Sequence, residues 1–213
     1  MYKSQSLEDF LAELSSRSPT PGGGTAAALA AAMGTSLVEM VANVVGSRDA
    51  LEKERLAPFV SYCSTSRAEF LVMMDRDSAA FDGYMTAVRM LRTTDEEKAV
   101  RRTAMQLALE RSTRAPLDLA RGVCSFVEMM VTSFPNTPKD IASDLYVGAS
   151  MLDAGFSGAI ANVYVNLSYL GDRSFAENAR LELGTYQERV RVLQTFKNDV
   201  GCLLSIGQAH ERG

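Results

Sequence analysis

Three consecutive glycines stand directly in front of a long run of small residues, and they are the first place where the chain could do chemistry. Gly22, Gly23 and Gly24 follow Pro21 and lead into an alanine-rich stretch from Thr25 to about Val45. Glycines at the start of a helix leave backbone N–H groups uncovered, and the helix N-terminus adds partial positive charge. This pattern suits a carboxylate, a phosphate or a flat ring lying against the backbone. The structural alternative is a helix of small side chains that packs closely against its neighbours.

Asp77 is the second candidate, because it is the only carboxylate in an apolar stripe of a predicted helix. By a turn of about 100° per residue, Asp75 and Asp82 point elsewhere, toward solvent. A carboxylate among apolar groups resists ionisation, so its pKa should rise, as a general acid or base working near neutrality requires. A structural ion pair with a buried arginine is the alternative. The stripe comprises Phe70, Asp77, Phe81, Tyr84, Val88 and Leu91.

A third group of polar residues lies in the C-terminal half. Asn162 and Asn166 are one helical turn apart, so they share a face of the predicted helix. Asp144 lies early in the same helical region, after a loop that contains Asn136. Two amides in register indicate either the edge of a ligand site or a polar network between helices.

The elements that must position these side chains are all predicted to be helices. No segment alternates apolar and polar residues with the period of a strand. Capping-box patterns at Ser6 and Thr94 mark two helix starts. The chain is therefore predicted to be one all-α domain, residues 1–213, built as a bundle of long helices. The expected helices run from Ser6 to the break at 19–24, from Thr25 to Val45, from Asp49 to Leu91 with a disturbance at Pro58, from Thr94 to Arg114, from Pro116 to the loop at 134–138, from Lys139 to Leu170 with breaks at Gly155 and Gly158, and from Ser174 to Gln208.

Composition argues against nucleic acids and membranes as partners. The formal net charge is −4 and no block of lysine and arginine occurs, whereas nucleic-acid binding usually requires a basic surface. The stretch from Thr25 to Val45 is the only candidate for a membrane span. Glu39 and Asn43 interrupt it, and its alanines are weakly hydrophobic, so we expect a buried or interfacial helix instead.

The cysteines and the histidine exclude several kinds of catalytic site. Cys63, Cys124 and Cys202 are odd in number and do not have the spacing of metal ligands. With no apolar signal core at the N-terminus, they favour a reduced, cytoplasmic compartment. Because His210 is the only histidine, a Ser-His-Asp or Cys-His nucleophile and a histidine zinc site are disfavoured. Acid–base work then falls to carboxylates, tyrosine or lysine, and no metal or other cofactor is expected.

Taken together, these blocks resemble a known family. The sequence is similar to the C-terminal domain family of formiminotransferase-cyclodeaminase, which includes stand-alone methenyltetrahydrofolate cyclohydrolases. The matching segments are Ser18–Ala28, Met40–Asn43, Asp77–Phe81, Thr94–Lys98 with Arg101, Ala115–Leu117, Asn136, Ser143–Asp144 and Asn162–Leu167.

The resemblance implies a dimeric all-α domain that acts on a tetrahydrofolate carrying a one-carbon unit. It implies that Asp77 corresponds to the proposed catalytic aspartate, in agreement with the stripe described above. It also implies a substrate-binding set of Pro21, Gly22, Gly23, Gly24, Asn43, Asp144, Asn162 and Asn166.

Three functions remain open. Hydrolysis of 5,10-methenyltetrahydrofolate to 10-formyltetrahydrofolate is favoured because no transferase domain accompanies this one. The alternative is cyclodeamination of formiminotetrahydrofolate, which releases ammonia. Lysines that the family carries after Asn43 are replaced here by Ser47-Arg48-Asp49, and an arginine stays charged, which counts against the deaminase. The third possibility is a binder of a folate-like ligand or a helical assembly protein without catalysis.

Overall fold

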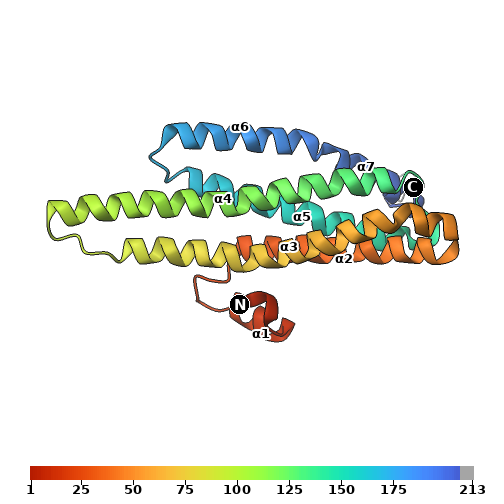
Figure 1. Ribbon diagram of the computed structural model, residues 1–213, viewed down its shortest axis with the longest axis horizontal. Coiled ribbons are helices and arrows are strands. Elements are labelled where there is room, and N and C mark those ends of the chain that lie inside the picture. The colour runs from red at the N-terminus through yellow and green to blue at the C-terminus, as the bar shows by residue number, and fades with distance from the viewer. Residues whose placement is uncertain (207–213) are drawn as a thin grey trace, which may run out of the picture.

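The structure is a computed structural model that describes residues 1–206, and all regular secondary structure within them is helical (Figure 1). This confirms the predicted all-α bundle of long helices. The elements in chain order are η1 (Tyr2–Ser4), α1 (Leu7–Leu14), α2 (Gly23–Arg48), α3 (Ala50–Val88), α4 (Asp95–Ser133), η2 (Lys139–Ile141), α5 (Ala142–Leu167), α6 (Arg173–Arg189) and α7 (Arg191–Leu203).

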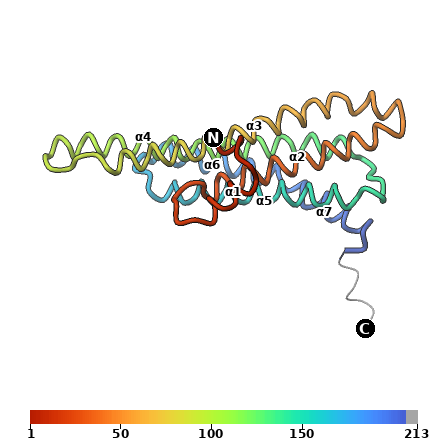
Figure 2. Tube along the Cα trace, turned by 90° about the horizontal axis from the view of Figure 1, so that it is seen from below, coloured from red at the N-terminus to blue at the C-terminus, as the bar shows by residue number. Residues whose placement is uncertain are grey.

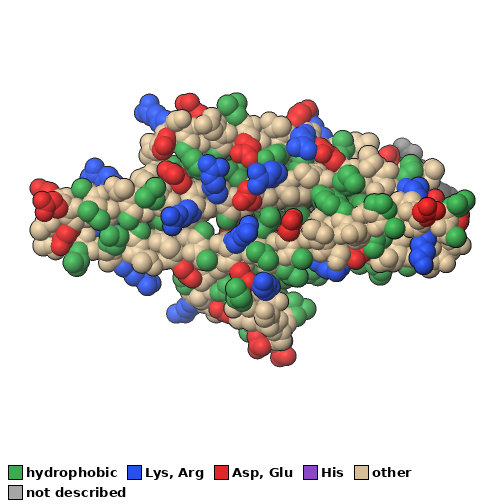
Figure 3. Space-filling model, in the orientation of Figure 1, with side chains coloured by type: hydrophobic (Ala, Val, Ile, Leu, Met, Phe, Trp, Pro, Cys, Tyr) green, Lys and Arg blue, Asp and Glu red, His purple; other side chains and the backbone are tan. Residues whose placement is uncertain are grey.

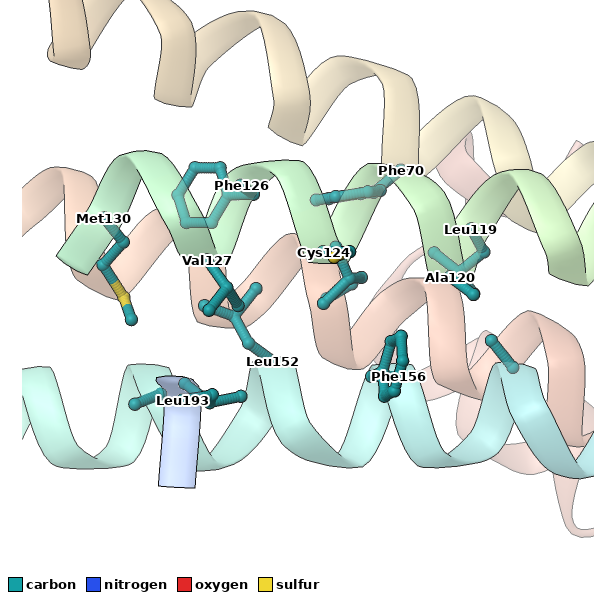
Figure 4. Close-up of a cluster of buried hydrophobic side chains, with 14 of the residues drawn as sticks. Phe70, Leu119, Ala120, Cys124, Phe126, Val127, Met130, Leu152, Phe156 and Leu193 are labelled. Atoms are coloured by element: carbon teal, nitrogen blue, oxygen red, sulfur yellow. The ribbon is translucent and has the colours of Figure 1, made fainter. Parts of the chain in front are cut away.

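Helices α2, α3, α4 and α5 form the bundle, and α6 and α7 pack on the outside of α4 and α5 (Figures 1 and 2). The short η1 contacts α3, and α1 lies beside the bundle (Figures 1 and 2). The hairpin of α3 and α4 projects beyond the end of α5 at one end of the molecule (Figures 1 and 2). The core is a continuous set of buried apolar side chains to which all helices from α2 to α7 contribute. Figure 4 shows part of it, including Phe70, Phe126, Leu152 and Leu193.

The small residues of α2 serve close packing against α5, as the structural interpretation predicted. A Cβ atom added at Gly34 would lie 2.7 Å from the carbonyl oxygen of Gly148. One added at Gly155 would lie 2.9 Å from the carbonyl oxygen of Ala27. At such distances the two helix backbones touch with no side chain between them. The predicted breaks at Gly155 and Gly158 are therefore wrong. Both glycines lie inside α5, and their lack of a side chain allows α2 to pack closely against them.

Both predicted capping sites are confirmed, and they explain where α1 and α4 begin. The Asp9 backbone N–H donates to Ser6 Oγ at 3.1 Å. Thr94 and Glu97 form a reciprocal capping box, in which the Glu97 N–H donates to Thr94 Oγ1 at 3.1 Å. Each side chain satisfies a backbone donor that the first helical turn leaves unpaired.

The predicted helix boundary at Pro116 is wrong, because α4 continues through it. A proline inside a helix loses one backbone hydrogen bond. Here Pro116 is buried inside α4, and the helix continues on both sides of it. At Pro58, in contrast, the prediction that the helix continues is confirmed, because α3 runs through this residue.

Three further predictions are corrected. Helix α3 ends at Val88, so the exposed Leu91 lies beyond the stripe. The predicted single helix from Ser174 is two helices, α6 and α7, and its expected end at Gln208 lies outside the described residues. Asp75 does not point to solvent: it is half-buried, and its Oδ1 accepts a hydrogen bond from the Tyr2 N–H at 2.6 Å. The N-terminal segment supplies the donor, which helical periodicity alone does not reveal.

One face of α2 is buried and the opposite face is apolar but open. By length and composition α2 is able to cross a membrane, yet 44% of its most apolar window is buried inside the bundle. On the outer face, Met33 and Met40 are 42% and 40% exposed. Elsewhere, charges of both signs mix over the molecular face in Figure 3, with no continuous basic field. The open apolar face of α2 therefore suits contact with another apolar surface.

Candidate active site

Asp77 lies against the N-terminal turn of α2, directly beside the glycines. A Cβ atom added at Gly24 would lie 2.6 Å from Asp77 Cγ and 2.7 Å from Asp77 Oδ2. The Thr25 hydroxyl donates to Asp77 Oδ2 at 2.9 Å. Gly22 is the N-cap residue of α2, and without a side chain it offers the helix no cap. The carboxylate of Asp77, which belongs to α3, therefore lies at the N-terminus of α2. Unpaired backbone N–H groups and the helix dipole favour an anion at this place.

The glycine run thus has a specific use in this fold. We expected it to receive a carboxylate, a phosphate or a flat ring, and the structure places the chain's own carboxylate there. Gly24 is buried and Gly23 is exposed beside it. Pro21, which is buried, ends the preceding loop through a cis peptide bond with Thr20. Asp77 lies against the glycine run at Gly24, whereas the backbone at Gly23 is exposed to solvent.

Burial raises the pKa of Asp77, as the apolar stripe predicted. Desolvation of the half-buried carboxyl is the largest cause, and hydrogen bonds from the side chain and backbone of Thr25 oppose it. Within residues 1–206, no arginine or lysine forms an ion pair with Asp77. The alternative of a structural ion pair is therefore not what the structure shows. A carboxyl that is destabilised when ionised is suited to accept and return a proton.

Thr25 and Ser78 complete the polar environment of Asp77, and sequence reasoning did not single them out. Thr25 Oγ1 also lies 3.0 Å from Ser78 Oγ, and both side chains are buried. This arrangement lets Ser78 donate to Thr25 while Thr25 donates to Asp77, which fixes the orientation of the carboxyl. The signal was present in the sequence, because each residue directly follows a candidate: Thr25 follows Gly24, and Ser78 follows Asp77.

Asn162 lies beside the glycine run. A Cβ atom added at Gly23 would lie 3.7 Å from Asn162 Nδ2, and that amide nitrogen donates to the Gly158 carbonyl at 2.8 Å. The hydrogen bond to Gly158 fixes the amide plane. Among the described residues, none donates to Asn162 Oδ1, so this oxygen is available to a ligand that brings its own N–H group.

Asn166 has a structural partner that explains the unbroken α4. Its Nδ2 donates to the Ser112 carbonyl at 2.7 Å. Ser112 is four residues before Pro116, and proline has no N–H to pair with that carbonyl. Asn166 thus replaces the lost helical hydrogen bond. The Ser112 hydroxyl in turn donates to the Ala80 carbonyl at 3.2 Å, one turn beyond Asp77. Asn166 therefore connects α5, α4 and the part of α3 that carries Asp77.

This interpretation predicts a coupled pair of substitutions. Asn166→Ala should lower the free energy of unfolding by about 1–3 kcal/mol, because it leaves the Ser112 carbonyl without its partner. In a Pro116→Ala background the residue 116 N–H pairs with that carbonyl, and the same substitution should cost about 1 kcal/mol less. Urea unfolding of the four proteins of this cycle measures the coupling. Pro58→Ala serves as the matched control, and equal coupling with it would refute the assignment.

Asn43 and Asp144 do not lie at Asp77 in the same chain. Asn43 is near the C-terminal end of α2, about 28 Å from Gly24 at the usual helical rise of about 1.5 Å per residue. Asp144 is in the first turn of α5, which runs antiparallel to α2, so it lies at that same far end. The structure therefore separates the predicted site residues into two groups.

The C-terminal end of α2, far from Asp77, carries an ion pair and a cavity. Arg48 is bound by Asp140, with Nη2 to Oδ2 at 2.6 Å and Nη1 to Oδ1 at 3.2 Å, which connects α2 to η2. Asn43 and Lys53 line a cavity of about 400 Å³ between α2 and α3. The backbone of Lys53 packs on Gly46, where an added Cβ would lie 3.2 Å from Lys53 Cα. Arg48 is thus engaged in an ion pair, while a lysine from α3 lies near Asn43.

Comparison with known proteins gives a consistent result. The model of the formiminotransferase-cyclodeaminase family matches residues 6–185. The chain is 35% identical over 209 residues to the methenyltetrahydrofolate cyclohydrolase of Methylorubrum extorquens, covering 94% of this chain and 100% of that protein. It is 31% identical over 211 residues to the formimidoyltransferase-cyclodeaminase of Sus scrofa, covering 96% of this chain and spanning 37% of the length of that relative.

The fold is also that of a solved relative. The crystal structure of formiminotetrahydrofolate cyclodeaminase from Thermotoga maritima matches with a TM-score of 0.80 and 25% sequence identity, covering 96% of this chain and 98% of that chain. The family match spans both the glycine run and Asp77, and it extends to the asparagines of α5. On these grounds the chain belongs to the formiminotransferase-cyclodeaminase family.

Proposed function

We propose that this protein is a folate one-carbon enzyme that hydrolyses 5,10-methenyltetrahydrofolate to 10-formyltetrahydrofolate, with Asp77 as the proton-transfer group. The observation that carries the proposal is the environment of the Asp77 carboxyl. Burial disfavours its ionised form and raises its pKa. The carboxyl lies against Gly24, and no cation among the described residues pairs with it. The relative named methenyltetrahydrofolate cyclohydrolase, which this chain matches over that protein's whole length, supports the choice of reaction.

The reaction needs a base first and an acid second. Water adds to the carbon that bridges N5 and N10, and the ionised Asp77 carboxylate accepts a proton from that water. The tetrahedral carbon then loses its bond to N5, and Asp77 returns the proton to N5. The remaining hydroxyl proton leaves to solvent as the formyl C=O forms on N10, so one proton is released overall. One carboxyl performs both transfers, which is why a pKa nearer neutrality assists it.

The surrounding residues support this use of Asp77. The substrate is a cation at its bridging carbon, so an adjacent carboxylate stabilises it electrostatically. Thr25 holds the carboxyl in place by its 2.9 Å hydrogen bond. The exposed backbone at Gly23 offers a flat surface to the pterin ring, and Asn162 Oδ1 accepts a hydrogen bond from it. The proposed reaction consists only of water addition and proton transfers. We therefore propose that the protein needs no cofactor besides its substrates, the tetrahydrofolate derivative and water.

Cyclodeamination of 5-formiminotetrahydrofolate is the second candidate. N10 attacks the formimino carbon, and ammonia leaves from the same kind of tetrahedral carbon. The relatives from Sus scrofa and Thermotoga maritima carry this activity in their names. The engagement of Arg48 by Asp140 disfavours it, because the basic group at the position of the family's lysines is then held in an ion pair. A folate binder without catalysis is the third possibility.

Absorbance of the methenyl chromophore distinguishes the three. Purified protein is mixed with 5,10-methenyltetrahydrofolate and, separately, with 5-formiminotetrahydrofolate, each against a protein-free control. The proposal predicts protein-dependent loss of the chromophore with the first compound. Appearance of the chromophore with the second, and no loss with the first, would assign the deaminase. No change with either compound, in a folded protein, would leave only binding.

We further propose that the protein works as a homodimer through the open face of α2. The outer positions of α2 recur at alternating steps of four and three, which is the spacing of a helix–helix seam. Two copies of α2 packed antiparallel about their midpoint would place the partner's Asn43 near the glycine run, which would unite the two separated groups. Sedimentation velocity of the whole chain tests this, since a monomer at assay concentration would exclude it. The positions are Ala26, Ala30, Met33, Leu37, Met40 and Val44.

A cytoplasmic location is likewise a proposal. The three cysteines are free thiols, and Cys63 and Cys124 are buried. Burial raises the pKa of the Cys63 thiol to about 12, which keeps it protonated and unreactive. Three free thiols and no disulfide between them support a reducing compartment. Fluorescence microscopy of a tagged protein in its native cell tests the location, and secretion would contradict it.

A further inference from the structure

A cavity of about 350 Å³ lies between α3 and α4, and three exposed arginines line it. Arg76 belongs to α3, whereas Arg111 and Arg114 belong to α4. Asp77 does not line this cavity, because its carboxyl lies against Gly24 of α2. The cavity is therefore separate from the candidate active site, although one of its arginines is the sequence neighbour of Asp77.

The protein does not neutralise these three arginines. Within residues 1–206, none of them forms an ion pair with a carboxylate. Two carboxylates line the same cavity, those of Glu110 and Asp118. Asp118 is already paired with Arg121, so Glu110 alone offsets the three arginines. The cavity therefore keeps an excess of two positive charges, which attracts anions.

Arg114 is held in place by an aromatic ring of α6, the helix that runs along α4 (Figure 1). Its Cζ atom lies 4.9 Å from the centroid of the Phe175 ring. Glu110 and Asp118 each lie one helical turn from Arg114, at the spacing of helical ion pairs, yet neither pairs with it. A guanidinium that stacks through its flat face keeps its in-plane N–H groups for other acceptors. Arg114 is thus oriented for an anion before the anion binds.

The arrangement favours a phosphate monoester over a carboxylate. The planar fork of arginine binds either group through paired hydrogen bonds. A phosphate monoester carries about 1.5 to 2 negative charges near neutral pH and offers three strong acceptor oxygens. It therefore matches the excess charge of the cavity and supplies an oxygen to each arginine. A carboxylate has one charge and two oxygens, so it leaves part of the excess charge unbalanced.

An organic group attached to the phosphate has room beside the arginines. Ala80 and Leu107 give the cavity an apolar wall. Arg76 also lines an adjoining cavity of about 870 Å³, to which Val72 and Met73 contribute. Small-molecule sites are commonly cavities of about 300–1,000 Å³ with apolar walls and a few charged groups that fix the orientation of the ligand. The two cavities together have this character.

We propose that Arg76, Arg111 and Arg114 bind the phosphate of a small organic phosphate monoester between α3 and α4. The organic part lies against the apolar walls of the two cavities. The bound phosphate connects the segment of α3 that carries Asp77 to α4. Because such a ligand binds only the folded protein, it should also raise the Tm. This site is independent of the folate reaction proposed above.

Two probes of the same shape and different charge test the proposal. Isothermal titration calorimetry compares phenyl phosphate with phenyl sulfate at low ionic strength and at about pH 8, where the phosphate monoester is a dianion. The wild type should bind phenyl phosphate at least about tenfold more tightly than phenyl sulfate, which carries a single charge. Arg111→Ala/Arg114→Ala should weaken the binding of phenyl phosphate at least about tenfold, because two of the three cations are lost. The rise in Tm that phenyl phosphate produces should disappear in the same variant.

A control pair separates the proposed site from a general loss of positive charge. Arg92→Ala/Arg102→Ala removes two exposed arginines near the tip of the α3–α4 hairpin and should keep the wild-type affinity for phenyl phosphate. Equal affinity of the wild type for the two probes, or no binding of phenyl phosphate, would overturn the site. Binding that survives Arg111→Ala/Arg114→Ala, or that falls as far in the control pair, would overturn it as well. Arg111→Ala/Arg114→Ala should keep turnover in the chromophore assay, so that assay reports on the proposed function separately.

Discussion

Asp77→Asn should abolish nearly all turnover while the protein stays folded. Proton transfer by a positioned side chain contributes about 10²–10⁴-fold to a rate, and an amide can neither accept the proton from water nor return it to N5. The asparagine side chain has nearly the same shape, and its carbonyl oxygen still accepts the hydrogen bond from Thr25 that the structure shows at 2.9 Å. The fall should therefore appear mainly in kcat, with substrate binding largely kept.

The same substitution should stabilise the protein near neutral pH. Burial raises the pKa of Asp77 in the folded state, so the folded state holds its proton more tightly than the unfolded state does. The free energy of unfolding then falls as pH rises from the unfolded pKa of about 3.9 through the raised folded pKa, and stays lower above it. The neutral amide of the Asp77→Asn variant has no charge to desolvate, so its gain in stability should vanish as pH falls below about 3.9.

Two measurements on the Asp77→Asn variant test these predictions of lost turnover and gained stability. The chromophore assay with 5,10-methenyltetrahydrofolate gives the loss of rate, and thermal unfolding at neutral and acidic pH gives the change in Tm. Wild-type turnover by Asp77→Asn would remove Asp77 from the chemistry. A variant that unfolds more easily than the wild type at neutral pH would contradict the assignment of burial as the dominant influence on Asp77.

Gly24→Ala should be the most damaging small substitution near the site. The new Cβ atom would lie 2.6 Å from Asp77 Cγ, and Gly24 is buried in the first turn of α2. Either the carboxyl or the helix must move. Overpacking of this kind costs about 1–3 kcal/mol of stability. Displacement of a catalytic group by about 1 Å lowers the rate by about a hundredfold, so turnover should fall well beyond the loss of folded protein.

Gly83→Ala is the matched control for this prediction. Gly83 is exposed in α3, and no atom lies within 4 Å of its added Cβ. The control should keep full turnover and gain about 0.5–1 kcal/mol, because alanine favours the helix over glycine. Urea unfolding and the chromophore assay on both variants give the comparison. If Gly24→Ala behaved like Gly83→Ala, Asp77 would not depend on the close approach at Gly24.

Much of this architecture was predictable from local patterns. Helical periodicity and the caps at Ser6 and Thr94 identified most helices, because these signals involve residues a few positions apart. The position of Asp77 in an apolar stripe predicted its burial and the direction of its pKa shift. Helix propensity, in contrast, wrongly placed breaks at Pro116 and Gly155, because tertiary contacts outweigh it at both positions.

What could not be predicted depends on partners distant in sequence. The contact between the Asp77 carboxyl and Gly24 joins residues from two helices. The spacing of residues within either helix alone does not predict this contact. The partner of Asn166 is a carbonyl freed by Pro116, which becomes visible only when α4 and α5 lie side by side. The separation of Asn43 and Asp144 from Asp77 follows from the length of α2 and its antiparallel packing on α5.

The pH dependence of kcat/KM tests most directly whether Asp77 transfers the proton. Since the ionised carboxylate acts first, kcat/KM should fall on the acidic side, with a midpoint above the ordinary aspartate pKa of about 3.9. Hydrogen bonds from Thr25 hold the pKa of Asp77 down, so Thr25→Val should move that midpoint to still higher pH. A midpoint at or below about 3.9, or one that Thr25→Val leaves in place, would contradict the account.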